Sequence, residues 1–341
     1  IITIKYKGVI NMNIKKIGLT ALAASLVSVS ANAGSMSVSG SASMNVSGYS
    51  GEELNAGSGY SMGNQLTFSG SGELDNGLNV SLSFVLDQGD DETDTSTASG
   101  NSPFDSHSVK VSSDMFGSLT LNGEGGTTTA NNIDGSAAGD IWDKFDTLAN
   151  SEKQKNAQGA YATASAGNNS FYYSSPELMD GLTVQASYMP QGSNRTSGSG
   201  IGATYTGVDG LTVKYAVADI VGTTAAASGD STVINLSYAY GPVTVKYSDM
   251  ASDIEAANSD YDITSYAVSY TVSDEISITY GTEDITQESG ASDAEFETMS
   301  ISYTAGGMTV TAGIHDAENG DFTTDSHADY EKWTLGASFA F

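Results

Sequence analysis

Four lysines of this chain lie within stretches in which apolar and polar residues alternate. Lys110, Lys214 and Lys246 each stand between two apolar residues, and Lys332 precedes Trp333. Because successive side chains of a β-strand point to opposite faces, all four lysines are expected on the face opposite the apolar row. Lysines on a polar surface attract and orient charged or polar solutes, so these residues are candidates for a solute-contacting wall.

A long polar segment at residues 125–157 carries the second group of candidate residues. Its charged candidates are Asp134, Asp140, Asp143, Lys144, Asp146 and Glu152. Ile141, Phe145 and Leu148 have the spacing of one face of a short helix, with Trp142 beside them. This pattern predicts that the apolar residues of the segment pack against the polar face that carries the lysines. Acidic side chains of the segment would then face the lysines and create an electric field across the space between them. The alternative is a solvated surface loop, although loops of this length without a role are uncommon.

Signals for catalysis are weak. Gly59–Gly63 matches the G-x-S-x-G pattern, but a predicted strand follows it where a helix is required, so chance explains the match. His107, His315 and His327 lack metal-ligand spacing, and we expect them near strand ends or in loops. The chain has no cysteine, which excludes disulfides and thiolate sites. We therefore expect no enzymatic activity and no cofactor.

Clusters of acidic residues occur near several predicted loops. Their members are Asp87, Asp90, Asp91, Glu92 and Asp94, then Asp293, Glu295 and Glu297, then Asp316, Glu318 and Asp321. Carboxylate oxygens suit Ca²⁺ or Mg²⁺, but none of the clusters has the spacing of an EF-hand loop. We expect either a solvated acidic surface or weakly bound Ca²⁺ or Mg²⁺ at these acidic loops, and assign no defined metal site.

The N-terminal part has the pattern of an export signal. Met12 is the expected initiator, and two lysines, an apolar run over Ile17–Val29 and a small-x-small cleavage site at Ala31–Ala33 follow it. The run is too short for a helix across ~30 Å of hydrocarbon. We expect residues 1–33 to hold upstream residues plus a cleavable signal peptide, and residues 34–341 to form one domain.

The acidity of the chain excludes one class of partner. The chain has 41 acidic and 12 basic residues, and its formal net charge is −29. All the acids and 8 of the basic residues follow the expected cleavage site, which gives 8 − 41 = −33 for the mature part. Such a surface does not neutralise phosphates, so nucleic-acid binding is not expected.

The elements expected to position these residues are β-strands. Alternating rows run through residues 78–86, 182–188, 211–217, 234–240, 243–247, 266–272, 276–280 and 333–341. Seven short turns alternate with eight longer polar loops, the first of which is expected at residues 48–61, and together they would join 16 strands. An even strand count with this alternation is typical of a transmembrane β-barrel, which closes because open strand edges in lipid leave backbone groups unpaired. A soluble β-sandwich is the alternative fold.

Three segments resemble parts of the general-diffusion porins. Lys332–Phe341 alternates and ends in Phe, which is similar to the C-terminal signal of outer-membrane barrels that the barrel assembly machinery reads. Gly117–Glu124, followed by the long acidic loop, resembles the fifth strand and third loop of these porins, and Asn169–Pro176 resembles the strand after that loop. The layout of the mature chain is most similar to that of alphaproteobacterial porins. The scarcity of Arg departs from many such porins, whose constriction carries several Arg.

This resemblance implies an all-β fold, a 16-stranded antiparallel transmembrane β-barrel with a long third loop folded into the lumen. It implies a homotrimer in the outer membrane, in contact with lipid and lipopolysaccharide, which forms a water-filled channel for passive diffusion of ions and small hydrophilic solutes. The excess of acids adds the expectation of mild cation selectivity. The alternative is a surface barrel without a pore, such as an adhesin or a structural outer-membrane protein.

Three further expectations concern the outer surface of the barrel. The last strand should pair with the strand near Met36–Val46 and present Phe341 to lipid. Tyr residues just before tight turns should form an aromatic girdle on the apolar face. These are Tyr205, Tyr240, Tyr270 and Tyr303. The small side chains of the first strand make that strand a candidate trimer contact.

Overall fold

The structure is a computed structural model in which the described residues are 34–51, 58–87, 105–126, 128–130, 133, 135–145, 168–190, 196–320, 322 and 329–341. The expected export signal at residues 1–33 lies outside them. Within the described part, no helix is both long and apolar enough to cross a membrane.

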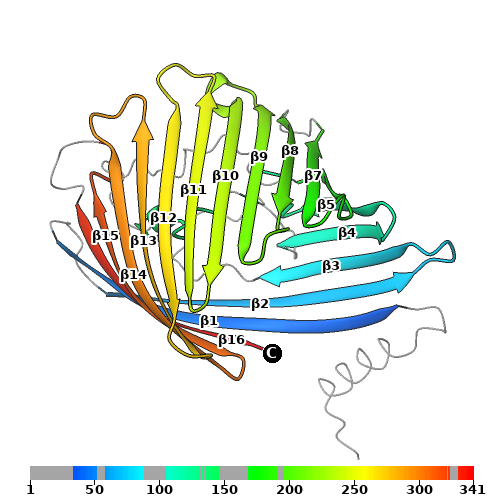
Figure 1. Cartoon of the computed structure of the whole chain (residues 1–341), viewed down its shortest axis with the longest axis horizontal. Coiled ribbons are helices and arrows are strands. Elements are labelled where there is room, and N and C mark those ends of the chain that lie inside the picture. The colour runs from blue at the N-terminus through cyan, green and yellow to red at the C-terminus, as the bar shows by residue number, and fades with distance from the viewer. Residues whose placement is uncertain are drawn as a thin grey trace, which may run out of the picture.

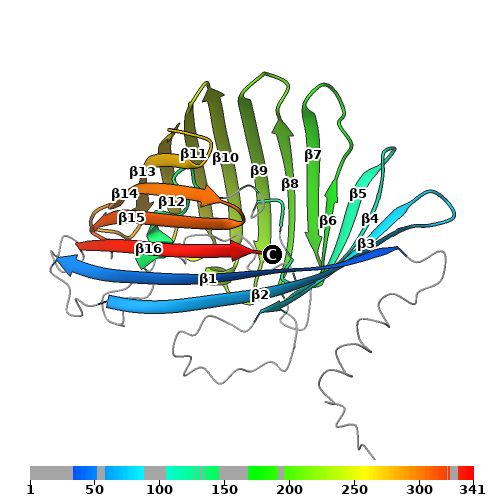
Figure 2. The same ribbon diagram turned by 90° about the horizontal axis from the view of Figure 1, so that it is seen from below.

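The chain folds into one closed antiparallel barrel in which each strand pairs with its sequence neighbours (Figures 1 and 2). The strands are β1 Ser35–Gly51, β2 Ser58–Glu73, β3 Asn79–Asp87, β4 Ser106–Ser113, β5 Gly117–Glu124, β6 Ser170–Ser174, β7 Leu182–Met189, β8 Ser197–Tyr205, β9 Leu211–Val221, β10 Gly229–Tyr240, β11 Val243–Ile254, β12 Tyr261–Thr271, β13 Ile276–Gln287, β14 Ala294–Ala305, β15 Met308–Glu318 and β16 Tyr330–Ala340. Within the described part of the chain, the short 3₁₀ helices η1 Ile141–Phe145 and η3 Ala225–Ala227 lie between strands.

The predicted 16-stranded barrel is confirmed, with short turns at one end and longer connections at the other. The first long loop is shorter than expected, because β1 continues to Gly51 and β2 begins at Ser58. Ladder pairing reaches Gly48 opposite Ser58, so small polar residues that suggested a loop extend the hairpin instead. Backbone pairing in the barrel outweighs their weak strand propensity.

The last residue closes the barrel against the first strand. The Phe341 N–H donates to the Gly40 carbonyl at 2.9 Å, and the Gly40 N–H donates to the Phe341 carbonyl at 2.7 Å. A Cβ on Gly40 would approach the Phe341 ring to 2.5 Å, so glycine makes room for the ring on the outer face. The register from Ser41 opposite Ala340 to Gly51 opposite Tyr330 confirms the expected pairing of the first and last strands.

The outer face is apolar and aromatic near the short turns, as the alternating rows predict. Tyr240, Tyr270 and Tyr303 are 76%, 49% and 43% exposed, and each lies on the same face as the apolar residues of its strand. Tyr205 shares the outward row of β8 with Ile201, which is 57% exposed. Rings with polar tips at this level suit the boundary between hydrocarbon and water.

At the other end of β9–β16 the outer face carries carboxylates, which we call the acidic belt. Its members are Asp219, Asp230, Asp249, Asp253, Asp262, Asp284, Glu295, Glu297, Asp316, Glu318 and Glu331, all exposed. Cross-strand register places acid opposite acid, as in the pairing of Asp230 with both Asp219 and Asp253. The expectation that Glu295 and Glu318 belong to loop clusters is therefore wrong, since they are strand residues on the outer wall. Their inward neighbours, such as Phe296, are buried, which turns the acids outward.

Candidate functional site

Described residues of the connection between β5 and β6 lie along the inside of the barrel wall. We call its described residues 128–130, 133 and 135–145 the inner loop. The Thr129 N–H donates to Ser187 Oγ on β7 at 2.9 Å, the Ala137 N–H to Ser248 Oγ on β11 at 2.8 Å, and the Ala138 N–H to Ser265 Oγ on β12 at 3.0 Å. These serines lie on inward rows, so wall hydroxyls satisfy backbone donors that water would otherwise have to satisfy.

Apolar packing holds the same segment. Ile141 is fully buried and Phe145 is 6% exposed, and both belong to one cluster with inward-facing wall residues. The wall residues of this cluster include Val233, Met250, Ile263, Ile285 and Phe296. The Phe145 and Phe296 ring centroids are 5.9 Å apart in a tilted arrangement. The spacing that predicted a short helical face thus corresponds to η1, whose two terminal residues contact the wall, whereas Leu148 lies outside the described residues.

A buried carboxylate on β13 holds the start of η1. Glu283 has no exposed surface, and its Oε2 accepts from the Ile141 N–H at 2.6 Å and the Trp142 N–H at 3.3 Å. Its Oε1 accepts a short hydrogen bond from Ser136 Oγ. A carboxylate at the first N–H groups of a helix satisfies donors that have no partner within the helix. Glu283 therefore fixes both the turn before η1 and the beginning of η1 against the wall.

Two wall glycines allow this close approach. A Cβ on Gly281 of β13 would come within 2.6 Å of the Ala138 Cβ, and one on Gly202 of β8 within 2.7 Å of Thr129 Cγ2. Any side chain at these inward positions would push the loop backbone away from the serines and from Glu283.

The C-terminal end of η1 is hydrogen-bonded to residues of β16 and β1, the two strands that close the barrel. Lys332 Nζ donates a short hydrogen bond to the Lys144 carbonyl, and Tyr49 OH donates to the same oxygen at 3.5 Å. The Lys332 ammonium also lies 4.7 Å from the centre of the Tyr49 ring, within the range of a cation–π contact. Lys332 therefore binds the inner loop in addition to lining the wall.

The acids expected in the inner loop differ in exposure. Asp140 closes the turn before η1, because its Oδ1 accepts from the Ser136 N–H at 2.9 Å at a positive φ of 52°. Asp143 is exposed, and Lys144 is half-buried. Asp134, Asp146 and Glu152 lie outside the described residues.

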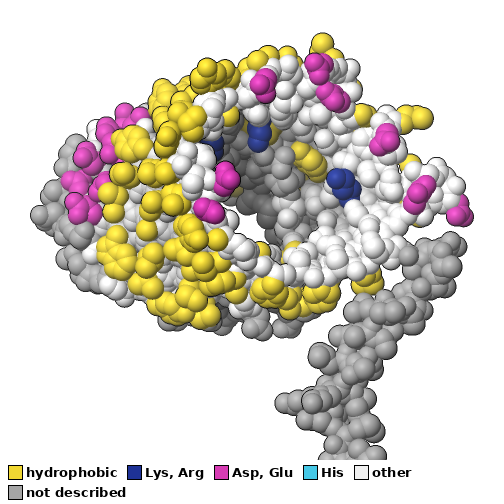
Figure 3. Space-filling view, turned by 60° about the horizontal axis from the view of Figure 1, so that its bottom comes forward, with side chains coloured by type: hydrophobic (Ala, Val, Ile, Leu, Met, Phe, Trp, Pro, Cys, Tyr) yellow, Lys and Arg dark blue, Asp and Glu magenta, His cyan; other side chains and the backbone are white. Residues whose placement is uncertain are grey.

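The expected wall lysines all project from inward rows, as Figure 3 illustrates with basic side chains inside the hollow of the barrel. Lys214 on β9 pairs in register with Asn235, whose Nδ2 donates to the Gly135 carbonyl of the inner loop at 2.8 Å. Lys246 on β11 is exposed, one inward position from Ser248. Lys110 lies on β4, apart from the serines of β7, β11 and β12 and from Glu283 of β13, which hold the inner loop.

The weak catalytic signals find no supporting geometry. Gly59–Gly63 lies within β2, whereas a nucleophile elbow needs a sharp turn between a strand and a helix. His315 is a buried residue of β15, not a loop residue, and its ring nitrogens lie 2.7 Å from Thr298 Oγ1 and 3.0 Å from Thr334 Oγ1. Among the described residues, no group of three or more His, Cys, Asp or Glu is placed to hold a metal ion.

The residues that fix the inner loop were not found from the sequence. Glu283 stands in Gly-Thr-Glu-Asp-Ile, and Ser187, Ser248 and Ser265 stand in strands already rich in serine. One usable signal was the apolar Val233, Ile263 and Ile285 on the polar row, which marks a stretch of inner wall that is covered. Apolar residues of a barrel strand ordinarily mark the outer face, so these inward apolar residues are hard to recognise in the sequence alone.

Comparisons with known proteins agree with this architecture. The model of the Gram-negative porin family matches residues 18–341. A loop-deletion variant of OmpT, an outer membrane protein of Vibrio cholerae, has 18% sequence identity and a TM-score of 0.65, covering 91% of this chain and 100% of that one. An anion-selective porin from Comamonas acidovorans has 14% identity and a TM-score of 0.62, covering 90% and 99%. A mutant of Rh. blastica porin has 16% identity and a TM-score of 0.61, covering 90% and 100%.

At these identities the structural likeness concerns the fold alone, and no curated protein sequence matches the chain. The family match, in contrast, extends over most of the sequence and coincides with the closed barrel. The chain belongs to the Gram-negative porin family, whose barrels reside in the outer membrane.

Proposed function

We propose that the protein forms a water-filled channel through which ions and small hydrophilic solutes diffuse passively. The observation that carries this proposal is the inner loop, which is fixed by hydrogen bonds to serines on β7, β11 and β12 and to Glu283 on β13. A loop fixed on one wall narrows the lumen without filling it, and leaves the polar side chains of the opposite wall in water.

In this channel the inner loop is the constriction. Asp143 is exposed on it and contributes negative charge beside Lys144, while Asp140 supports the turn. We assign Asp134, Asp146 and Glu152 to the same constriction on the basis of sequence alone. Lys110, Lys214 and Lys246 supply positive charge on the wall, and Lys332 contributes less because it also holds the Lys144 carbonyl.

The net charge favours a mild preference for cations. Carboxylates of the acidic belt and of the loops raise the local cation concentration near the mouth, and this effect weakens as salt screens exposed charges over ~10 Å at 0.1 M. Replacing both Asp140 and Asp143 by Asn should move the cation-to-anion permeability ratio toward anions by roughly twofold. Replacing Lys214 and Lys246 by Gln should move it the other way.

Planar-bilayer recording of the purified protein tests the proposal. Discrete conductance steps with an ohmic, salt-dependent size support a pore, and reversal potentials in a salt gradient give its selectivity. Preference for anions in the unaltered protein would show that the lysines outweigh the acids. Absence of any channel from a correctly folded, heat-modifiable barrel would favour the alternative, a surface barrel that acts as an adhesin or structural protein.

We also propose the assembly route and the partners of the barrel. Residues 1–33 direct export and are removed, and the terminal Phe341 is read by the barrel assembly machinery. Lipid surrounds β9–β16, with lipopolysaccharide at the level of the acidic belt. Three copies associate through the outer face of β1–β5, where Met44, Val46 and Met62 continue the apolar surface toward the long-loop end.

A further inference from the structure

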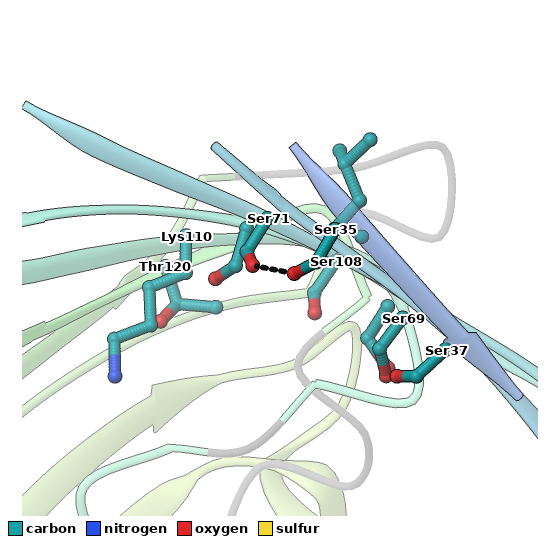
Figure 4. Close-up of a pocket in the computed structure, with 11 residues that line it drawn as sticks. Ser35, Ser37, Ser69, Ser71, Ser108, Lys110 and Thr120 are labelled. Atoms are coloured by element: carbon teal, nitrogen blue, oxygen red, sulfur yellow. Dashed lines mark hydrogen bonds between the residues drawn. The ribbon is translucent and has the colours of Figure 1, made fainter. Parts of the chain in front are cut away.

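Part of the inner face of β1–β5 is rich in hydroxyl groups, and we call this part, the lining of one cavity, the hydroxyl wall. Ser35 and Ser37 of β1 lie beside Ser69 and Ser71 of β2, and Ser81, Ser83 and Ser108 continue the surface across β3 and β4. Figure 4 labels the serines of β1 and β2 together with Ser108, Lys110 and Thr120, and shows them projecting from one side of the strands. They line a cavity of about 280 Å³.

Lys110 is the basic residue of this cavity. In register it is flanked by Ser81 on β3 and Thr120 on β5, so a hydroxyl stands on either side of its strand position. Its side chain is exposed, and within the described part of the chain no carboxylate contacts it or lines the cavity. The only hydrogen bond among the labelled side chains joins Ser35 Oγ and Ser71 Oγ at 3.0 Å. The remaining described hydroxyls of the cavity are therefore available to a solute.

An ammonium group surrounded by hydroxyl donors suits a small oxyanion. Hydrogen bonds from charged or hydroxyl donors to carboxylate or phosphate oxygens are short and strong compared with neutral pairs. The nearest inward carboxylate along these strands is Glu73, two residues beyond Ser71, at about 12 Å from Lys110 by strand rise and spacing. At physiological salt, screening largely removes the repulsion between the Glu73 carboxylate and an oxyanion bound at Lys110. The cavity has no aromatic ring on which a sugar could stack, which favours an anion over a neutral polyol.

We propose that Lys110 and the hydroxyls beside it form a weak binding site for the oxyanion group of a permeating solute, such as a phosphate, sulfate or carboxylate. The site rests on the proposed channel function and specifies a solute class for it. It is compatible with a general preference for cations, because acids at the mouth set the bulk selectivity while the hydroxyl wall retains particular anions within the lumen.

Single-channel recording with inorganic phosphate tests the site. In KCl at ~0.1 M ionic strength, added potassium phosphate should reduce the conductance in a saturable manner when total ionic strength is held constant. Lys110→Gln should raise the half-saturating phosphate concentration by roughly tenfold, the effect of losing one charge-assisted contact. The paired variant Ser81→Ala with Thr120→Val should raise it by roughly threefold, since the ammonium remains.

Lys246→Gln is the matched control, because it removes the same charge from another part of the inner wall. It should keep the half-saturating concentration within about twofold of the unaltered protein. Equal effects of Lys110→Gln and Lys246→Gln would overturn the site, since they would indicate a general field. Channels that conduct normally but show no saturation by phosphate would also overturn it, and leave the proposed pore intact. Absence of channels in the unaltered protein would instead contradict the proposed function.

Discussion

The outer faces of the two halves of the barrel differ in charge. Along β1–β8 the described outward residues are apolar, small or uncharged polar apart from Tyr, His107 and the half-buried Glu124, which lies opposite His107 across a β-bulge. Along β9–β16 the same face has the acidic belt at its long-loop end. Carboxylates are tolerated at the level of lipid headgroups but are costly in a contact between barrels or in hydrocarbon. The difference indicates that the two halves face different surroundings.

The inner faces of β9–β14 and of β1–β5 also differ, in whether the inner loop covers them. On β9–β14 the inward residues covered by the inner loop are an apolar cluster together with the serines and Glu283 that hydrogen-bond the loop, while the acids of the acidic belt face outward. On β1–β5 the inward residues that line the cavity are mainly hydroxyls, with Lys110 among them. One half of the wall therefore supports the loop, and the other half is available to solutes.

The largest effect should come from placing a charge on the outer face of β1 and β2, whose described residues carry no charge. Met62 is outward on β2 and 43% exposed, and Met62→Glu should convert the proposed trimer into monomers because a carboxylate buried in the interface without a partner is strongly destabilising. Thr232→Glu is the control, since Thr232 lies on the acid-bearing face of β10 at a similar distance from the long-loop end. Light scattering in detergent measures the mass of both. A trimeric Met62→Glu protein, or two monomeric variants, would contradict this assignment of the interface.

An intermediate effect should follow from removing the carboxylate that holds the inner loop. Glu283→Ala leaves the Ser136 hydroxyl and the N–H groups of Ile141 and Trp142 without their acceptor, at about 1–3 kcal/mol for each buried donor left unsatisfied. We expect the single-channel conductance to rise by roughly twofold, with more current noise, while the barrel stays folded. Glu297→Ala, on the outer face of β14, should leave the conductance unchanged. A Glu283→Ala channel with unaltered conductance and noise would show that apolar packing alone fixes the loop.

The smallest effect concerns divalent ions at the acidic belt. In vesicles that contain lipopolysaccharide, removal of Mg²⁺ and Ca²⁺ by a chelator should lower the unfolding temperature by a few degrees, because like charges on the belt and on lipid phosphates lose their bridging ions. Asp230→Asn combined with Asp253→Asn should reduce this shift. The same chelator effect in vesicles without lipopolysaccharide would assign it to the protein alone, and no effect in either would leave the belt as a solvated surface.

The sequence predicted the barrel well because strand count and closure depend on local features. Turn residues such as Asp209-Gly210, alternation along each strand and the terminal Phe341 are all readable without knowledge of tertiary contacts. Strand phase was also correct near the short turns, where Tyr240 and Tyr270 face outward.

Prediction was weaker for the site, because the inner loop changes what the inner wall must be. Ile285 and Phe296 occupy inward positions since the loop buries them, and the neighbouring Asp284 and Glu295 must then face outward. A strand in which apolar residues alternate with acids does not show by itself whether the apolar row faces lipid or lies inside the barrel beneath a loop. Glu283 was missed for the same reason, as its role depends on Ile141 and Trp142, which are distant in sequence and meet it only in the folded barrel.

The contact between Gly40 and Phe341 has a consequence for the order of events during biogenesis. Its two hydrogen bonds join positions separated by nearly the whole mature sequence, so this ladder has the highest contact order in the molecule. The entropy of closing so long a loop is offset only when the final strand arrives. Until then β1 presents an unpaired edge, and the nascent barrel is an open sheet that can add strands but also aggregate. Pairing of Phe341 with Gly40 is thus part of the step that removes this open edge.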